Sequence, residues 1–333
     1  MPQSFGLISK LNRKLIYGKR DLKYFFGLEN NFFRKARGAR ILIYHGICLQ
    51  DHTRFNPIFL TRKMFEEQLL LFRKYCNLIT LDQYFAGQFS NDRFNLCITF
   101  DDGFANNFKY ALPLLQKHQL PATFFITAIR ESGYNILWND FLGIVTKYGP
   151  QELSYDGQLY RKDHYGRYVS VEKQKTLADT LKENGFGHKK EMMKKLQYLF
   201  PDNIGEEDYW MQMTKEEISA LSTHPFVTIG SHGYYHNRLD KLPIADAIDE
   251  MKNSKLFLER LTGKKIKAIA FPYGNYSRRL IEEAKKLGYE QLLAMDFHFP
   301  EDRDDHCLQE RLTVNPFISA NNQLHASITG KYE

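Results

Sequence analysis

Residues 96–103 read L-C-I-T-F-D-D-G, a short apolar run that ends in two acids and a glycine. Such a run, bounded by a turn signal, is typical of a strand buried on both faces of a sheet. Similar runs occur at 39–44, 122–127, 226–230 and 266–271, and apolar residues at helical spacing follow several of them. Short apolar strands that alternate with helices predict a parallel sheet covered by helices, and seven or eight such units favour a closed β/α barrel.

The alternation continues along the chain, except in its middle. Further helices are expected at 61–75, 104–118, 244–261 and 277–287, and short strands near 290–293 and 312–314. Between residues 131 and 213 the pattern changes: Ser154–Tyr160 predicts a hairpin, and two Lys-rich segments, 171–183 and 188–200, predict helices. A capping box at Thr214–Glu217 restarts the regular pattern. We therefore expect 131–213 to be an insertion between two barrel strands rather than an independent domain.

The basic excess lies at the N-terminus. The 333 residues include 46 Lys and Arg against 39 Asp and Glu, a net charge of +7, yet residues 1–40 alone carry a balance of +8. In the arm formed by residues 1–38, apolar residues recur at helical spacing among the basic ones: Leu7, Ile8, Leu11, Leu15, Ile16, Leu22, Phe25, Phe26, Phe32 and Phe33. This pattern is typical of an interfacial helix on anionic lipid, and equally of a helix packed across the base or open seam of a barrel.

The composition also excludes several classes of protein. With 43% hydrophobic and 26% charged residues, the chain is neither disordered nor a membrane protein, and no apolar stretch reaches the ~18–20 residues of a spanning helix. There is no secretory signal, and four scattered cysteines indicate free thiols, so we expect a cytoplasmic protein that can work at the inner face of the membrane. Nucleic-acid binding would rest on the basic arm alone, so no nucleic-acid partner is expected.

Two strand ends carry residue types that bind metals. Asp101 and Asp102 end the first run, and His232 and His236 follow the run at 226–230, spaced so that one helical turn would bring both imidazoles to one face. The carboxyl ends of parallel strands meet at the edge where β/α barrels hold their active sites. Two His and one Asp leave a position for water on a divalent metal, as in hydrolytic sites. Each feature alone is also an ordinary turn or an accidental pair.

A third strand-end motif, F-P-Y-G, occupies residues 271–274. Pro272 and Gly274 fix an unusual backbone path there, which could present the Tyr273 N–H to a developing oxyanion. P-Y-G is also an ordinary turn.

Taken in order, T-F-D-D-G (99–103), S-H-x-x-x-H (231–236) and F-P-Y-G resemble the first three motifs of the polysaccharide deacetylases, the NodB-homology enzymes of carbohydrate esterase family 4. Y-H-G-I at 44–47 and P-A-T-F-F-I at 121–126 fit as well. The resemblance covers about residues 39–330, apart from the insertion. It implies an α/β fold, a distorted (β/α)7 TIM-like barrel, and a metal-dependent deacetylase that acts on N-acetylated sugars of a polysaccharide, an oligosaccharide or a lipid-linked glycan.

The resemblance also implies a role for each motif residue. Asp102, His232 and His236 would hold a divalent metal, usually zinc in this family. Asp101 would be the general base that activates the metal-bound water, and the Tyr273 N–H would stabilise the oxyanion. The neighbours of that tyrosine, Pro272 and Gly274, are assigned to substrate binding.

Three features depart from the family pattern. Ala270 stands where many members have an arginine that holds the catalytic aspartate, Gly233 replaces the usual Ser or Thr, and the late L-x-H motif with the general-acid histidine is missing. We expect Arg311 to supply the guanidinium to Asp101, with a surface arginine as the alternative. His45 is the candidate that protonates the leaving amine or binds substrate, unless it bonds only to backbone. Three C-terminal histidines are interpreted as surface residues: His298, His306 and His325.

Two rival functions stay open at this point. One is an amidohydrolase that acts on a small cyclic amide, and the other is a catalytically silent carbohydrate-binding protein. The intact set of two acids and two histidines argues against the silent protein. Trp138-Asn139-Asp140 has a composition suited to stacking on a sugar ring, but core packing of Trp138 is favoured.

Overall fold

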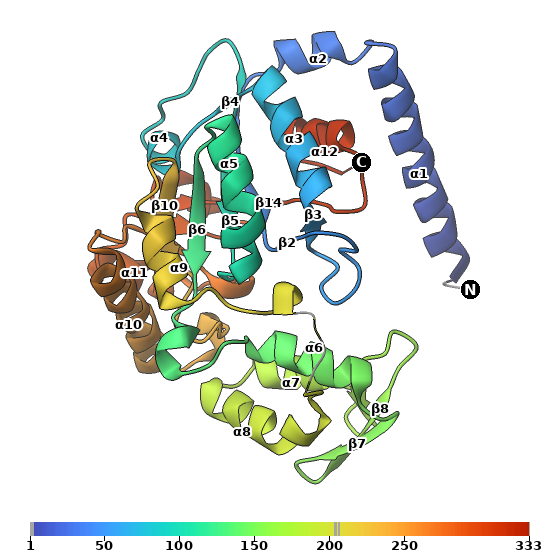
Figure 1. Cartoon of the computed structure of the whole chain (residues 1–333), viewed down its shortest axis with the longest axis vertical. Coiled ribbons are helices and arrows are strands. Elements are labelled where there is room, and N and C mark those ends of the chain that lie inside the picture. Colours follow the sequence, from blue (N-terminus) through green and yellow to red (C-terminus); the bar gives the residue numbers. More distant parts are fainter. Residues whose placement is uncertain (1–2, 203–204, 206, 333) are drawn as a thin grey trace.

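The molecule has two lobes, and a parallel sheet lies inside the larger one, surrounded by helices (Figure 1). The computed structural model describes residues 3–202, 205 and 207–332, with side chains from residue 12 onward. Within this part of the chain the strand order is β13-β12-β11-β10-β6-β5-β1-β14, and β4 pairs with β5. The strands are β1 (Ala39–Tyr44), β4 (Cys76–Leu78), β5 (Phe94–Phe100), β6 (Ala122–Ile126), β10 (Val227–Ser231), β11 (Ala268–Ala270), β12 (Gln291–Leu293), β13 (Leu308–Gln309) and β14 (Leu312–Thr313).

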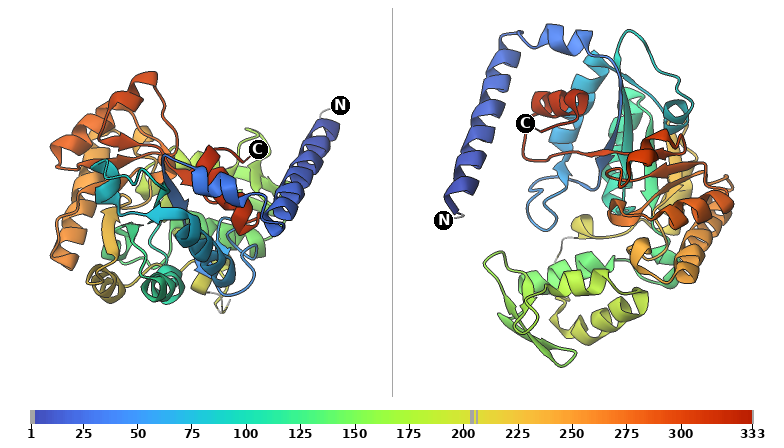
Figure 2. Two further views of the ribbon diagram at one scale, coloured as in Figure 1. Left: turned by 90° about the horizontal axis from the view of Figure 1, so that it is seen from above. Right: turned by 180° about the vertical axis from the view of Figure 1, so that it is seen from behind.

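Helices cover the outside of this sheet (Figures 1 and 2). They are α3 (Arg62–Tyr75), α4 (Leu81–Phe85), α5 (Leu112–His118), α9 (Lys215–Ser222), α10 (Ile244–Thr262), α11 (Arg278–Lys286) and α12 (Ala320–Thr329). A two-stranded pair, β2 (Ile47–Cys48) and β3 (Leu60–Thr61), connects β1 to α3. The predicted helix at 104–118 begins instead with a π-helical turn, Asn107–Ala111, before α5. Every residue of β5 and β6 is buried, as expected for central strands of a covered parallel sheet.

The expected distorted β/α barrel is confirmed, and it has an open seam. Strands β13 and β14 lie at opposite ends of the sheet order, yet only Glu310 and Arg311 separate them in the chain. No hydrogen-bonded pairing joins β13 to β14 among the described residues. The chain therefore crosses the seam at Arg311, which places this side chain beside the interior of the barrel.

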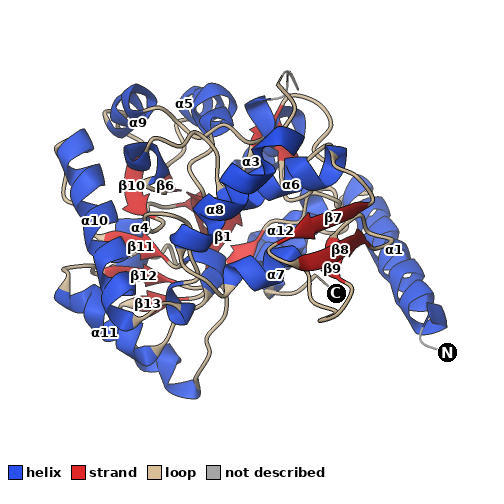
Figure 3. Cartoon of the chain, turned by 90° about the horizontal axis from the view of Figure 1, so that it is seen from below, coloured by secondary structure: helices blue, strands red, loops and turns tan. Residues whose placement is uncertain are grey.

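The segment predicted as an insertion lies between β6 and β10 and forms a second lobe (Figure 1). It contains α6 (Trp138–Tyr148), a three-stranded antiparallel sheet of β7 (Glu152–Tyr155), β8 (Gln158–Lys162) and β9 (Tyr168–Ser170), then α7 (Leu177–Lys182) and α8 (Phe186–Leu196) (Figure 3). The predicted hairpin and the Thr214–Glu217 capping box are confirmed. The helix predicted from residue 171 starts only at Leu177, because the chain before it pairs with β8 as an unpredicted third strand.

The N-terminal arm forms α1 (Gln3–Phe25) and α2 (Asn30–Lys35) at the edge of the molecule (Figure 2). Its polar residues face the barrel: the Tyr17 hydroxyl donates to the Tyr332 carbonyl, and the Asp21 carboxylate accepts bonds from Ser319 and Asn322. Large apolar side chains are exposed instead, namely Leu15, Ile16, Leu22, Phe25, Phe26, Leu28 and Phe32, whereas Phe33 is buried. The side chains of Leu7, Ile8 and Leu11 lie outside the described part.

Two further expectations concern thiols and membrane spans. Cys48, Cys76, Cys97 and Cys307 are all described, and all four are free thiols, as predicted. Among the helices described, none combines the length and apolar character needed to cross a bilayer.

Candidate active site and metal centre

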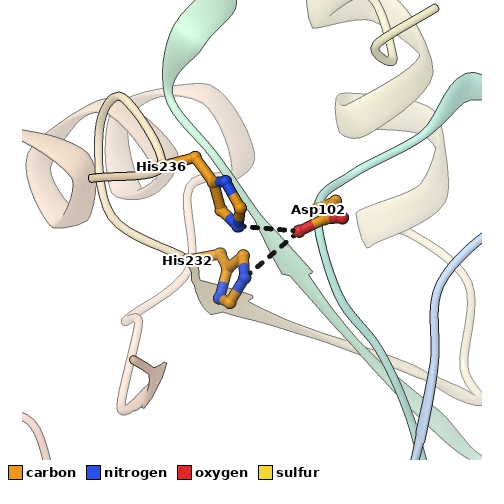
Figure 4. A group of neighbouring side chains, drawn as sticks. All are labelled: Asp102, His232 and His236. Carbon is orange, nitrogen blue, oxygen red and sulfur yellow. Dashed lines mark ion pairs between the residues drawn. The ribbon is translucent and has the colours of Figure 1, made fainter. Parts of the chain in front are cut away.

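Asp102, His232 and His236 form a buried group at the carboxyl edge of the sheet (Figure 4). The Asp102 Oδ1 lies 3.3 Å from the His232 Nε2 and 3.2 Å from the His236 Nε2. No member of the group is more than 5% exposed. The structure thus brings together the three residues that the sequence predicted as metal ligands.

Neighbouring strands bring these residues to one place. Strand β6 pairs with β5 on one side and with β10 on the other, so the ends of β5 and β10 lie close together. Asp102 adopts a left-handed backbone conformation, φ 74°, directly after β5. The His232 N–H donates to the Ile126 carbonyl at 2.9 Å, which continues the β6–β10 ladder to the site.

The prediction that a helical turn brings the two imidazoles together was wrong. Residues 232–238 form a loop, not a helix. The loop folds back because Gly233 and His236 both have positive φ, 74° and 56°. Glycine adopts this conformation freely, whereas a histidine does so at a cost and needs support from its surroundings.

The three side chains fit a divalent metal such as zinc. The His232 Nδ1–H donates to the Ala270 carbonyl at 2.8 Å, which fixes the tautomer and leaves the Nε2 lone pair toward Asp102. Burial alone would raise the pKa of Asp102, but the His236 and His232 imidazoles outweigh it and hold that pKa well below its usual range. An ionised carboxylate and two imidazole nitrogens, each with a ligand atom within 4.8 Å of the others, are a zinc-type donor set.

Asp101, beside the candidate metal-ligating group, is held by Arg311. The two guanidinium nitrogens Nη1 and Nη2 donate to Oδ1 and Oδ2 at 2.8 and 2.7 Å, a bidentate pair, and Nη1 also donates to Thr99 Oγ1 at 3.1 Å. The Arg311 side chain is only 1% exposed, so the surface-arginine alternative was wrong. Burial opposes ionisation of Asp101, but Arg311 overcomes it and lowers the pKa of the carboxyl. Arg311 therefore supplies from the seam the guanidinium partner of Asp101 that Ala270 cannot provide.

His45 follows β1 at the same edge. Its Nδ1 is buried and has no hydrogen-bond partner in the described structure. Burial lowers the pKa of His45, while the charges of Asp102 and Asp101 act in the opposite direction. The alternative prediction was that His45 bonds only to backbone. The Nδ1 of His45 makes no such hydrogen bond in the described structure.

The F-P-Y-G turn contributes Tyr273, whose ring lies 4.6 Å from the His236 ring, centroid to centroid. Tyr273 has a left-handed φ of 60°, so the backbone turns sharply beside the candidate metal ligands. Pro272 and Gly274 are buried, and a Cβ on Gly274 would meet Met295 atoms at 2.5 to 2.7 Å. Close packing explains this glycine, and its role in substrate binding stays a prediction.

Sequence reasoning did not assign two polar residues of the second lobe, Asp140 and Lys189, to the site. The Asp140 Oδ2 has no partner in the described chain, and burial, with the charge of Asp102, raises the pKa of Asp140 well above its usual range. Lys189 is 0% exposed and lies in a Lys-rich helix, where no sequence signal distinguishes it from its exposed neighbours. As favoured, Trp138 is a core residue, 1% exposed. The C-terminal histidines lie elsewhere: His298 stacks on Tyr276 and His325 on Phe32.

Several solved structures resemble this fold, and some of them are described as deacetylases. The deacetylase PplD of Streptococcus pyogenes, solved with acetate, is 15% identical with a TM-score of 0.56 over 87% of this chain and 97% of its own. IcaB of Ammonifex degensii is 17% identical with a TM-score of 0.53 over 88% and 97%. A polysaccharide deacetylase of Bacillus cereus is 20% identical with a TM-score of 0.54 over 87% and 68%. At these identities the likeness defines the fold.

The sequence defines the family. The pattern of the polysaccharide deacetylases matches residues 90–153 and 188–292, just over half of the chain, so the chain belongs to the polysaccharide deacetylase family. It is accordingly an enzyme of the class that deacetylates carbohydrates. The matched segments contain Asp101, the three candidate ligands and Tyr273, but neither His45 nor Arg311. A comparison with curated protein sequences finds no match.

Proposed function

We propose that the chain hydrolyses the acetamide group of N-acetylated sugars in a polysaccharide, an oligosaccharide or a lipid-linked glycan, with zinc held by Asp102, His232 and His236. The observation that carries this proposal is the juxtaposition of two differently held carboxylates. Asp102 faces two imidazoles at 3.2–3.3 Å, while Asp101 is clamped by Arg311 at 2.7–2.8 Å. Asp102 is thereby suited to bind a metal, and Asp101 is suited to accept a proton.

A divalent cation bound by the three ligands supplies Lewis acidity, which polarises a carbonyl and lowers the pKa of water. Asp101 accepts the proton of the attacking water, and Arg311 keeps its carboxylate ionised and oriented. The Tyr273 N–H donates to the oxyanion that forms at the acetyl carbonyl oxygen when water adds to the carbonyl carbon. When the C–N bond breaks, acetate leaves and the sugar nitrogen takes up a proton, for which His45 is the candidate donor.

Acetate release from the zinc-loaded protein tests the proposal, with N-acetylglucosamine oligomers and lipid-linked N-acetylated sugars as substrates. The Asp101→Asn variant keeps the size of the side chain and removes the base, so we expect its kcat to fall by at least about 100-fold, within the range for a lost general base. Undiminished activity of this variant would overturn the mechanism. Hydrolysis of small cyclic amides without acetylated sugars would favour the rival amidohydrolase. Sugar binding without acetate release would favour the silent protein.

The identity of the proton donor is tested separately. If His45 protonates the leaving amine, His45→Ala changes the pH–rate profile as well as kcat. The matched variant Asp140→Asn removes another protonatable group that lies near the charge of Asp102 and whose Oδ2 is buried. A profile altered only in the Asp140 variant would assign the proton to Asp140 instead of His45.

We further propose that the arm formed by residues 1–38 contacts an anionic membrane, at the inner face of the membrane if the glycan is lipid-linked. Two observations support this. Phe25, Phe26 and Leu28 at the turn between α1 and α2 are 81%, 65% and 68% exposed, although the polar side of α1 is packed against the barrel. Exposed basic residues flank the turn, among them Lys19, Lys23, Arg34 and Lys35. Aromatic and aliphatic side chains beside lysines and arginines complement an anionic lipid surface.

A further inference from the structure

The inserted lobe contains a lysine that is completely buried. Lys189 on α8 is 0% exposed, and its Nζ lies 4.8 Å from the centroid of the Trp138 ring. Its ammonium donates a hydrogen bond to the Oδ1 of Asn237, which belongs to the metal-ligand loop, residues 232–238. Lysine is almost never fully buried unless it is paired, because removing the ammonium from water is costly. Burial accordingly lowers the pKa of Lys189 to about 8.

The charge that compensates this ammonium comes from the barrel. The Asn237 side-chain amide donates to the Oε1 of Glu250, a residue of α10 that is 7% exposed. The other carboxylate oxygen, Oε2, accepts the Tyr235 N–H at 3.3 Å. Lys189, Asn237 and Glu250 therefore form a buried polar chain that runs from the inserted lobe through the metal-ligand loop to α10.

The two candidate histidine ligands differ in how they are held. The His232 ring is fixed by its own hydrogen bond to the Ala270 carbonyl. The Nδ1 of His236 is buried and has no partner in the part of the chain described here, so its ring lacks the outer hydrogen bond that usually orients a metal-ligating histidine. Its backbone is also in the costly left-handed conformation, φ 56°.

Three hydrogen bonds around His236 compensate for the absent hydrogen bond of its ring. The Trp138 Nε1–H donates to the His236 carbonyl at 3.3 Å, the Glu250 carboxylate accepts the Tyr235 N–H, and the Lys189 ammonium donates to the Asn237 side chain. Two of these three contacts come from the inserted lobe. A residue keeps a left-handed conformation when several contacts hold it there, and here hydrogen bonds hold His236 and the residues before and after it.

We propose that Lys189 is a positioning residue for His236. The inserted lobe would then hold one ligand of the metal centre in its binding conformation. The proposal rests on the proposed metal-dependent function, because it gives the lobe a task only if His236 binds a metal. Without the ammonium, Asn237 and Glu250 lose the group that fixes them, and His236 is free to relax out of its left-handed conformation.

Zinc affinity of the full chain tests this, measured by competition with a chromogenic chelator. The Lys189→Met variant keeps the length of the side chain and removes the charge, and Lys190→Met, on the same helix but exposed, is the matched control. We expect Lys189→Met to lower zinc affinity about 10- to 100-fold, as loss of an outer-sphere partner typically does, and to lower kcat more than it changes KM. Lys190→Met should match the wild type in both respects.

If Lys189 only attached the inserted lobe to the barrel, Lys189→Met would lower the melting temperatures of the zinc-free and zinc-loaded proteins equally. Its zinc affinity would then stay within twofold of the wild type, and this outcome overturns the proposal. If Lys189→Met does not fold, the double variant Lys189→Met/Glu250→Gln, which leaves no unpaired buried charge, is measured in the same way, and wild-type zinc affinity in it is equally fatal. A wild-type chain that binds no zinc and releases no acetate would refute the proposed function itself.

Discussion

The carboxyl edge of the barrel and the N-terminal arm depart from ordinary protein surfaces in opposite ways. At the edge, charged groups are buried and paired: Asp101 with Arg311, and Asp102 with two histidines. In the arm, large apolar groups are exposed, with Phe25 at 81%. Buried charges and exposed aromatic residues both cost free energy relative to the usual arrangement, and such local exceptions are where function is expected.

The two regions differ in what holds their side chains in place. Pairing within the chain fixes the charged side chains of the edge, so a single substitution there leaves a buried charge without its partner. Phe25 and Phe26 of the arm are exposed and contact each other's rings, but neither holds a charge that a substitution would leave unpaired. Substitutions at these two positions are therefore expected to leave the folded chain intact and to change only what it binds. The predictions below are arranged by the size of the effect they expect.

The largest effect is expected at the seam. Arg311→Ala leaves the buried Asp101 carboxylate without its partner, and breaking a buried pair in this way costs about 3–5 kcal/mol. We expect that loss in urea unfolding, together with a fall in kcat/KM of at least about 100-fold. The exposed pair of Arg278 with Glu301 is the control, since Arg278→Ala should cost no more than about 1 kcal/mol. Wild-type kcat/KM in Arg311→Ala would remove the arginine from the mechanism.

A smaller effect is expected from the metal. Zinc that binds the folded chain but not the unfolded one stabilises it by about 2.7 kcal/mol at a concentration 100 times its Kd. Thermal unfolding with and without zinc should show this increase in the wild type and not in Asp102→Ala. A second cluster of ligating residue types, Asp305, His306 and Cys307, provides the control, because His306→Ala should leave the increase unchanged. If the His306→Ala variant lost the stabilisation by zinc, the zinc site would have to be assigned to the cluster of Asp305, His306 and Cys307.

Much of the edge could be predicted from the sequence, because each strand ended in a recognisable motif. The parallel order of β5, β6 and β10 turned those motifs into one site. Arg311 was also predicted, although it lies outside the segments that match the family, since an arginine beside a short strand late in the chain could reach the sheet's edge. Spacing alone misjudged the path from His232 to His236, because a period of four also fits a loop with two left-handed residues.

The contribution of the inserted lobe could not be predicted, for a physical reason. In a Lys-rich helix every lysine looks like a solvated one, and Lys189 differs only through tertiary contacts with Trp138 and Asn237. The orientation of α1 was equally hidden. An amphipathic pattern normally predicts that the apolar side faces the protein, whereas here Tyr17 and Asp21 face it instead.

The contact between arm and barrel should depend on pH. His325 of α12 stacks on Phe32 of α2, ring centroids 4.9 Å apart, and burial, helped by the charges of Arg20 and Lys23, lowers its pKa to about 4. Below about pH 6.5 the unfolded histidine takes up a proton that the folded one resists, so this stabilisation is lost as the pH falls from about 6.5 to 4. The protection of the α2 amides, taken relative to the intrinsic exchange rate at each pH, should fall over that range in the wild type and change less in His325→Gln. An equal loss of protection in both would place the titrating group elsewhere.

The smallest effect on catalysis, and a large one on location, is expected in the arm. Phe25→Ser/Phe26→Ser removes two exposed rings that would each contribute up to about 1.5–3 kcal/mol on burial in lipid, so flotation with anionic vesicles should fall at least about tenfold. Tyr198→Ser, 74% exposed on the other lobe, is the matched control and should float like the wild type. Acetate release from soluble oligomers should be unchanged in both, because neither site touches the buried edge. If the wild-type chain does not bind anionic vesicles, the membrane proposal fails.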